Sequence, residues 1–203
     1  MKVAWVLGWA VPLPWFARYA EATFPGAEHY FAEPGPDVWE RLEGAGACDA
    51  LGGYSLGAQL LLENQARAAR VAPRVGLLAP IFAFAQEAGL GGKIARAQIK
   101  FLARWLRRER AAALADFYLR AGLDVPADWS GALPGATLEW GLSRLENGAG
   151  QPPAPRDWKL FCGTDDALLD GAQLAALDPA LQLVAGATHH PEKLMHAWAR
   201  EFF

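Results

Sequence analysis

Residues 53–57, with the sequence GYSLG, constrain the fold most strongly, because they place a serine between two glycines directly after an apolar stretch. A strand that turns abruptly into a helix holds its turn residue in strained backbone geometry. Strand and helix then pack closely only when glycine stands two residues to either side. The pattern therefore predicts a strand, a sharp turn at Ser55 and a helix, with the hydroxyl presented at the edge of a sheet. It is typical of a nucleophile elbow.

Short apolar segments alternate with helical ones on both sides of this turn, which indicates a parallel sheet with helical crossovers. Strands are expected at 3–7, 28–31, 49–54, 75–79, 159–162 and 181–185. Helices of the same unit are expected at 38–42, 56–71, 171–177 and 191–202. Because 53% of the 203 residues are hydrophobic, the chain can fill the core of such a domain.

The alternation stops after Pro80, and no further strand is expected before residue 155. The interval contains helical stretches at about 93–108 and 111–121 and closes with the linker-like sequence NGAGQPPAP at 147–155. We therefore expect an α/β core at 1–80 and 155–203, interrupted by a helical cap at 81–154.

Charge and hydropathy exclude several classes of protein. The net charge of −3 and the pI near 5.8 argue against a nucleic-acid-binding or membrane-surface protein. No segment approaches the roughly 18 consecutive apolar residues of a membrane span, and the first residues lack the features of a signal peptide. Cys48 and Cys162 lie in apolar segments without metal-ligand spacing. A cytoplasmic protein with two inert core thiols is expected.

A serine hydroxyl becomes an effective nucleophile only with a base within hydrogen-bond reach and a carboxylate that orients the base. Two predicted strands are followed by residues of this kind, in the sequences GTDD at 163–166 and GATHHP at 186–191. The first offers Asp165 or Asp166 as the acid, and the second offers His189 or His190 as the base. In every combination the chain order is serine, acid, histidine.

This order, together with the turn at Ser55, resembles the α/β-hydrolase superfamily. The resemblance implies a mostly parallel sheet of about six strands with an inserted helical cap. In that family the acid often follows a glycine and two further residues, which favours Asp166. The histidine is often separated from a proline by one residue, which favours His189. The implied catalytic triad is therefore Ser55, His189 and Asp166.

The family also forms an oxyanion hole from two backbone N–H groups. In this sequence the resemblance assigns them to Trp9, in the loop after the first strand, and to Leu56, which follows the nucleophile. The early loop departs from the family pattern, because it reads LGWA at 7–10 where His-Gly is usual. A backbone donor survives this change, since it needs no particular side chain.

Residues 93–110 concentrate positive charge. Seven basic residues and one acid give this segment +6, which leaves −9 for the rest of the chain. At 100° per residue, one side of a helix would carry Arg96, Lys100, Arg104, Arg107 and Arg108, and the other Ile94, Phe101, Leu102, Trp105 and Leu106. Such a face is commonly just a solvated surface. On an otherwise acidic protein it also fits an anionic partner, to which these five basic residues would bind.

An apolar inner face above the serine suits an aliphatic chain, and a basic outer face suits an acidic carrier, which together indicate acyl groups borne by acyl carrier protein. With its Gly8-Trp9 pair, triad positions and arginine-bearing cap, the chain is most similar to the esterases of biotin synthesis that demethylate pimeloyl-acyl-carrier-protein methyl ester. The resemblance implies a carboxylesterase that forms an acyl-enzyme and needs no metal or cofactor. A thioesterase, a general short-chain carboxylesterase and a non-catalytic binding protein of the same fold are the alternatives.

Overall fold

Among the residues that the structure describes, the sheet has six strands, all parallel, in the order β2-β1-β3-β4-β5-β6. The computed structural model describes residues 1–202, apart from the side chains of residues 130–132. The strands are β1 (Lys2–Val6), β2 (Glu28–Ala32), β3 (Ala50–Tyr54), β4 (Val75–Leu78), β5 (Lys159–Gly163) and β6 (Leu181–Val184). The predicted fold class is confirmed. Phe203, the last residue of the predicted core, lies outside the described residues.

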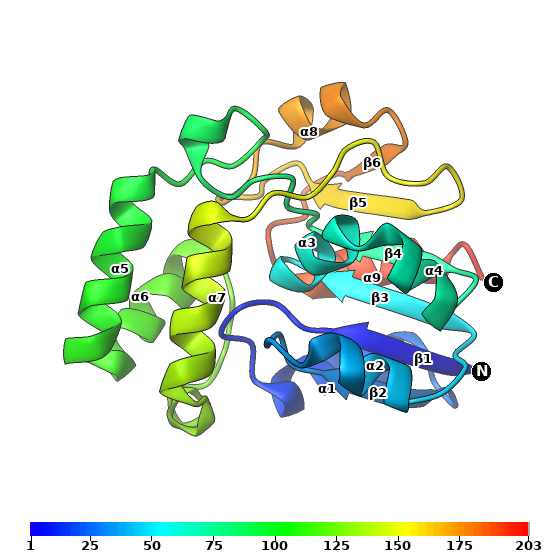
Figure 1. Ribbon diagram of the computed structural model, residues 1–203, viewed down its shortest axis with the longest axis horizontal. Helices are drawn as coiled ribbons and strands as arrows, with labels where there is room; N and C mark the ends of the chain where they lie inside the picture. The colour runs from blue at the N-terminus through cyan, green and yellow to red at the C-terminus, as the bar shows by residue number, and fades with distance from the viewer. Residues whose placement is uncertain (203) are drawn as a thin grey trace.

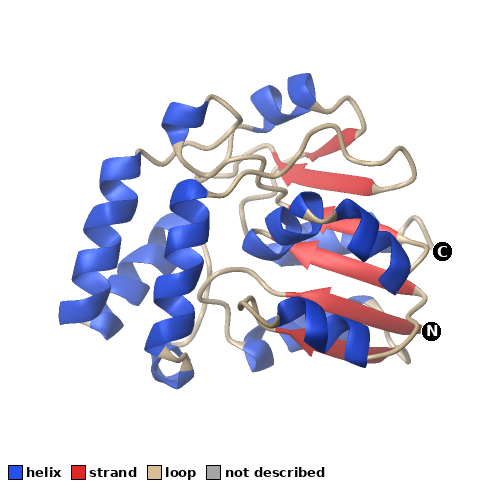
Figure 2. Ribbon diagram, in the orientation of Figure 1, coloured by secondary structure: helices blue, strands red, loops and turns tan. Residues whose placement is uncertain are grey.

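Helices cover both faces of the sheet (Figure 1, Figure 2). On one face, α1 (Leu13–Thr23) packs against α9 (Pro191–Ala199). The other face carries α2 (Val38–Gly44), α3 (Leu56–Glu63) and α4 (Gln65–Val71), and α8 (Gly171–Leu177) packs against the edge strand β6. The result is a three-layer α/β/α core.

Two tryptophans fix the position of α9 against the sheet. A Cβ on Gly52 in β3 would lie 2.4 Å from the ring of Trp5, and one on Gly76 in β4 would lie 2.1 Å from the ring of Trp198. The two buried indoles meet edge to face with their centroids 5.3 Å apart, which is a favourable aromatic geometry. The glycines therefore let α9 approach the sheet closely, and with it the loop that precedes α9.

The cap lies between β4 and β5. It contains η1 (Gln86–Ala88), α5 (Arg96–Arg108), α6 (Arg110–Ala121), η2 (Ala127–Ala132) and α7 (Gly135–Asn147). These helices stand at the carboxyl ends of the strands, toward which the arrowheads point in Figure 1. Helix α5 packs against both α6 and α7, and α7 contacts α3 of the core. The cap therefore stands over the strand ends that carry the candidate catalytic residues.

Some helices differ from the sequence-based prediction. The prediction lacks α1, whose second residue is Pro14, and α7, which begins at Gly135 and contains Gly141. Proline is tolerated in a first turn, and tertiary packing can outweigh the low helix propensity of glycine. The single helix predicted at 56–71 is divided at Asn64, whose backbone angles (φ −133°, ψ 49°) are not helical.

Within residues 1–202, no helix is long and apolar enough to cross a membrane. No group of three or more His, Cys, Asp or Glu side chains in the same range is placed to hold a metal ion. Cys48 and Cys162 are both buried, and neither forms a disulfide bond.

Candidate active site

Ser55 forms the sharp turn between β3 and α3. Its backbone angles are φ 53° and ψ −116°, a left-handed conformation that is strained for a residue with a Cβ. A Cβ on Gly53 would lie 2.9 Å from Cα of Ala58, and one on Gly57 would lie 2.1 Å from the carbonyl oxygen of Val6 in β1. Both glycines therefore permit the close contact of α3 with the sheet that the turn requires.

The structure brings Ser55, His189 and Asp166 together in one hydrogen-bonded chain. Oγ of Ser55 lies 3.0 Å from Nε2 of His189, and Nδ1 of His189 lies 2.8 Å from Oδ2 of Asp166. His189 and Asp166 are almost completely buried, whereas Ser55 is 8% exposed. An ionised carboxylate only accepts hydrogen bonds, so Nδ1 carries the proton and Nε2 offers its lone pair to the serine hydroxyl. This is the arrangement that general-base activation of a serine requires.

The carboxylate of Asp166 is held by backbone donors as well as by the histidine. Its Oδ1 accepts the N–H groups of Leu168 (2.8 Å) and Leu169 (3.0 Å), while Oδ2 faces His189. Burial raises the pKa of Asp166, but the attraction of His189 and these hydrogen bonds outweigh it and hold the pKa below its usual value. Asp166 is therefore ionised at neutral pH in a fixed orientation.

Tyr54, inside the GYSLG sequence, holds the loop of the candidate base. Its hydroxyl donates to the carbonyl oxygen of His189 at 2.8 Å in the interior of the protein. Burial raises the pKa of Tyr54 well above its usual value, and the nearby charge of Asp166 contributes a smaller rise. The phenol therefore keeps its proton. Sequence reasoning did not identify this residue, because the motif leaves its middle positions open.

Asp165 and His190, the alternative candidates for the acid and the base, make other contacts. Asp165 is exposed and accepts a hydrogen bond from the hydroxyl of its neighbour Thr164 at 3.1 Å. His190 turns away from Ser55, and its Nε2 lies 3.1 Å from both the hydroxyl of Tyr19 and Oδ1 of Asp124. In this arrangement neither Asp165 nor His190 belongs to the serine-centred chain.

Asp124, on the segment after α6, joins the cap to the core. Its carboxylate accepts hydrogen bonds from the indole of Trp15, the guanidinium of Arg18 and the hydroxyl of Tyr19, all on α1. Burial raises the pKa of Asp124, but hydrogen bonds from His190, Trp15 and Tyr19 outweigh it and hold the pKa at about 2. The charged carboxylate thus stabilises the contact of the cap with α1.

The two predicted oxyanion donors belong to segments that adjoin Ser55. Leu56 is the first residue of α3, so its N–H has no carbonyl acceptor one turn earlier in that helix. The loop that carries Trp9 passes directly by Ser55, because a Cβ on Gly8 would lie 3.2 Å from Cβ of Ser55. The assignment of these two N–H groups as oxyanion donors stays a prediction, which the backbone beside Ser55 permits.

The side chain of Trp9 ties this loop to the cap. Its Nε1 donates to the carbonyl oxygen of Leu138 in α7 at 2.8 Å, and its ring meets that of Phe117 in α6 edge to face at 4.6 Å. A Cβ on Gly141 would lie 2.3 Å from the indole, so this glycine of α7 makes room for it. The hydroxyl of Tyr118 also donates to the carbonyl oxygen of Ala10, at 2.7 Å.

A mostly apolar pocket of about 300 Å³ lies inside the cap. Its lining includes Trp9, in the predicted oxyanion loop, and Leu168, whose N–H binds the carboxylate of Asp166. Its apolar walls also include Phe84, Ile94, Ile99, Leu102, Trp105, Phe117, Leu142 and Leu145. Three polar side chains line it as well: Gln98 and the ion pair of Arg120 with Asp116, in which Nε and Oδ2 are 2.7 Å apart. The pocket therefore offers space for an apolar group beside Trp9 and Leu168.

The five basic residues predicted to bind a carrier all lie on the exposed surface of α5 but are not equivalent. Lys100 pairs with Glu146 at 3.5 Å and Arg107 with Glu139 at 3.3 Å, both acids of α7. No ion pair within the described residues involves the side chain of Arg104 or Arg108. Phe101 lies on the predicted apolar side, where it lines the apolar pocket with Leu102 and Trp105, but its ring is 58% exposed.

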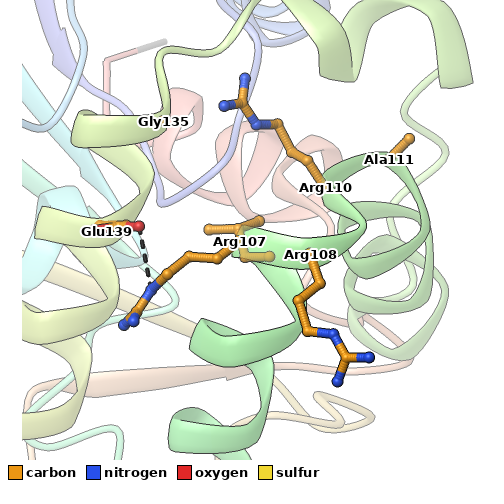
Figure 3. Close-up of a pocket in the computed structure, with 7 residues that line it drawn as sticks. Arg107, Arg108, Arg110, Ala111, Gly135 and Glu139 are labelled. Carbon is orange, nitrogen blue, oxygen red and sulfur yellow. Dashed lines mark ion pairs between the residues drawn. The ribbon is translucent and has the colours of Figure 1, made fainter.

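A basic hollow of about 540 Å³ lies where the end of α5 meets the starts of α6 and α7 (Figure 3). Arg107, Arg108 and Arg110 line it with Glu139. Figure 3 shows the three guanidinium groups pointing in different directions, with that of Arg107 toward Glu139. The positive charge is therefore spread over a surface instead of converging on one point.

No protein-family model matches the sequence, and no curated protein matches it. Several solved structures, in contrast, are similar to this chain. The chain is similar to an esterase from Exiguobacterium antarcticum with a TM-score of 0.81 at 14% identity, over 99% of this chain and 91% of that one. It is also similar to a thermophilic esterase from Thermogutta terrifontis (TM-score 0.68, 13% identity, 100% and 88% covered) and to a bottromycin epimerase (TM-score 0.69, 16% identity, 99% and 88% covered).

At these identities the similarity identifies the fold alone, and that fold is the α/β-hydrolase fold. An epimerase among similar structures illustrates that one fold hosts different reactions. The activity of this chain must therefore be argued from its own site.

Proposed function

We propose that this protein is a serine carboxylesterase with Ser55 as nucleophile, His189 as general base and Asp166 as the residue that orients the base. The continuous hydrogen-bonded chain from Oγ of Ser55 to the ionised carboxylate of Asp166 is the observation that carries the proposal. It places the base within reach of the hydroxyl and fixes the productive tautomer.

In the proposed reaction, Oγ of Ser55 attacks the ester carbonyl while Nε2 of His189 takes its proton. The backbone N–H groups of Trp9 and Leu56 stabilise the oxyanion of the tetrahedral intermediate. His189 then protonates the departing alkoxide, which leaves an acyl-enzyme at Ser55. Water, deprotonated by His189, hydrolyses the acyl-enzyme and regenerates the serine.

The cap supports an acyl group as the recognised part of the substrate. The apolar pocket beside Trp9 and Leu168 suits an aliphatic chain, because burying the chain there removes apolar surface from water. The outward arginines of α5 suit an acidic partner that presents several carboxylates across a surface. These features support the methyl ester of pimeloyl-acyl carrier protein as the specific substrate.

Hydrolysis of a p-nitrophenyl ester tests the esterase proposal. We expect Ser55→Ala to reduce kcat/KM by about 10⁴-fold or more while the circular dichroism spectrum stays unchanged. Ser143→Ala, at an exposed serine of α7, is the matched control and should keep full activity. Full activity of Ser55→Ala would show that Ser55 is not the nucleophile.

The carrier proposal is tested by reversing charges that make no ion pair with α7. We expect the double variant Arg104→Glu, Arg108→Glu to raise KM for pimeloyl-acyl-carrier-protein methyl ester by about tenfold. Its kcat/KM for a p-nitrophenyl ester should stay unchanged, and the effect on KM should shrink in high salt. The control Arg70→Glu, Arg200→Glu makes the same charge change outside the cap. Equal losses on both substrates would contradict docking on α5.

The leaving group is tested on one carrier-bound chain. Release of methanol from the methyl ester is compared with cleavage of the thioester that links the same acyl chain to its carrier. The proposal expects methanol release with the thioester left intact. Thioester cleavage as the faster reaction would make the protein a thioesterase with the same triad.

A further inference from the structure

The short segment 91–93, which precedes α5 in the cap, supports the loop that carries Asp166. Gly92 and Leu169 form an antiparallel bridge, and the N–H of Asp170 donates to the carbonyl oxygen of Gly91 at 2.8 Å. The N–H of Lys93 donates to the carbonyl oxygen of Leu168 at 2.9 Å. Because the N–H groups of Leu168 and Leu169 bind the Asp166 carboxylate, this segment holds the same residues that orient the acid.

Lys93 makes a further contact that reaches Asp166 itself. Its Nζ donates to the backbone carbonyl oxygen of Asp166 at 2.6 Å. A hydrogen bond from an ammonium group is stronger than one between neutral groups. The peptide of Asp166 is therefore fixed at its carbonyl by the cap and at its carboxylate by the loop and His189. Lys93 thus differs from the basic residues of α5, because it is directed toward the catalytic loop.

We propose that Lys93 is a positioning residue that holds Asp166 in register with His189. It touches neither the substrate nor the reacting atoms and acts only through the backbone of the acid. Loss of the ammonium group lets the carbonyl of Asp166 rotate, and the carboxylate then turns away from Nδ1 of His189. The kinetic consequence rests on the proposed esterase function, whereas the change in the hydrogen bond does not.

Two variants at position 93 test whether a charged hydrogen-bond donor is needed there. Lys93→Met keeps the aliphatic length and removes the donor, and Lys93→Arg restores a charged donor. Lys2→Met is the matched control, because Nζ of Lys2 donates to a backbone carbonyl oxygen, that of Ala45, at 2.7 Å and at the opposite end of the strands. The three variants are compared by thermal unfolding, ester hydrolysis and proton NMR.

In the kinetic measurement, we expect Lys93→Met to lower kcat for a p-nitrophenyl ester by about 10- to 100-fold with KM changed less than about twofold. Lys93→Arg should recover most of this loss, and Lys2→Met should leave kcat unchanged. A purely structural role would lower the unfolding temperature of Lys93→Met and Lys2→Met alike without a selective loss of kcat. Wild-type kcat in Lys93→Met would overturn the proposal.

Proton NMR reports on the hydrogen bond between His189 and Asp166 without any substrate. The deshielded proton that His189 donates to Asp166 should shift or broaden in Lys93→Met and stay in place in Lys93→Arg and Lys2→Met. If this proton is unchanged in Lys93→Met, the proposal is wrong even if the protein is an esterase. If it shifts in a protein that hydrolyses no ester and whose Ser55 does not react with a fluorophosphonate, the positioning role stands and the proposed function fails.

Discussion

Replacing Gly57 with alanine tests the close packing beneath Ser55. The added Cβ would lie 2.1 Å from the carbonyl oxygen of Val6 and 2.7 Å from that of Leu7. An ordinary carbon–oxygen contact is about 3.3 Å or longer, so α3 must retreat from β1 by roughly 1.2 Å. Because both atoms it meets belong to the backbone, no side chain can move aside to absorb the methyl group.

The expected cost follows from this displacement. Overpacking of about 3 kcal/mol, the upper end of the usual range, lowers the unfolding temperature of a protein of this size by roughly 6–12 °C. Moving Oγ of Ser55 by about 1 Å relative to His189 lowers kcat by on the order of 100-fold. We expect both effects together, measured by thermal unfolding and by hydrolysis of a p-nitrophenyl ester.

Gly44→Ala is the control for this experiment. Gly44 is the last residue of α2, and a Cβ there would meet no atom within 4 Å. Because alanine favours the helix over glycine, this variant should be as stable as the wild type or more stable, by up to about 1 kcal/mol. If Gly57→Ala unfolds at the wild-type temperature and keeps its activity, the close approach of α3 to β1 is refuted.

Three further predictions concern the side chains around the triad. Asp166→Asn should lower kcat/KM by about 10³- to 10⁴-fold in a folded protein, because an amide no longer fixes the productive tautomer of His189; a loss below tenfold in an ester assay would contradict this. Tyr54→Phe removes the buried donor to the carbonyl of His189, and urea unfolding should show a loss of about 1–3 kcal/mol; an unchanged midpoint would exclude this role. The pKa of Asp124, about 2, lies below the usual 3.8, so its charged form stabilises the fold above pH 4 and loses this effect as the pH falls toward 2. The stability difference between wild type and Asp124→Asn should shrink over that range, and a constant difference would show that the carboxylate charge is irrelevant.

Much of the core could be predicted from the sequence, because its signals are local. Most strands are short apolar runs, with β2 (Glu28–Ala32) the weakest of them, and the alternation of strands and helices implies parallel pairing without knowledge of any contact. The turn at Ser55 could be predicted for the same reason, because its two glycines are required by steric limits that act within a few residues of the turn. The position of the acid and base at later strand ends follows from parallel topology, which brings those ends to one edge.

The properties of the cap depend on contacts between segments that are distant in the sequence. Helical periodicity places Lys100 and Arg107 on a basic face, but it cannot indicate that Glu146 and Glu139 of α7 lie opposite them. It also places Phe101 on the apolar side, although the surface that α6 and α7 offer to α5 leaves this ring largely uncovered. The contact of Lys93 with Asp166 joins residues 73 positions apart, and no local pattern predicts it.

The indole of Trp9 has a consequence for protein engineering. One residue supplies a candidate oxyanion donor from its backbone and a hydrogen bond to α7 from its side chain, in a space that Gly141 leaves open. A different cap grafted onto this core would have to reproduce the acceptor at Leu138 and the gap at Gly141. Chimeras that retain α7 and exchange only α5 and the outer surface of α6 therefore offer the rational route to altered substrate choice, because they leave the oxyanion loop in its native environment.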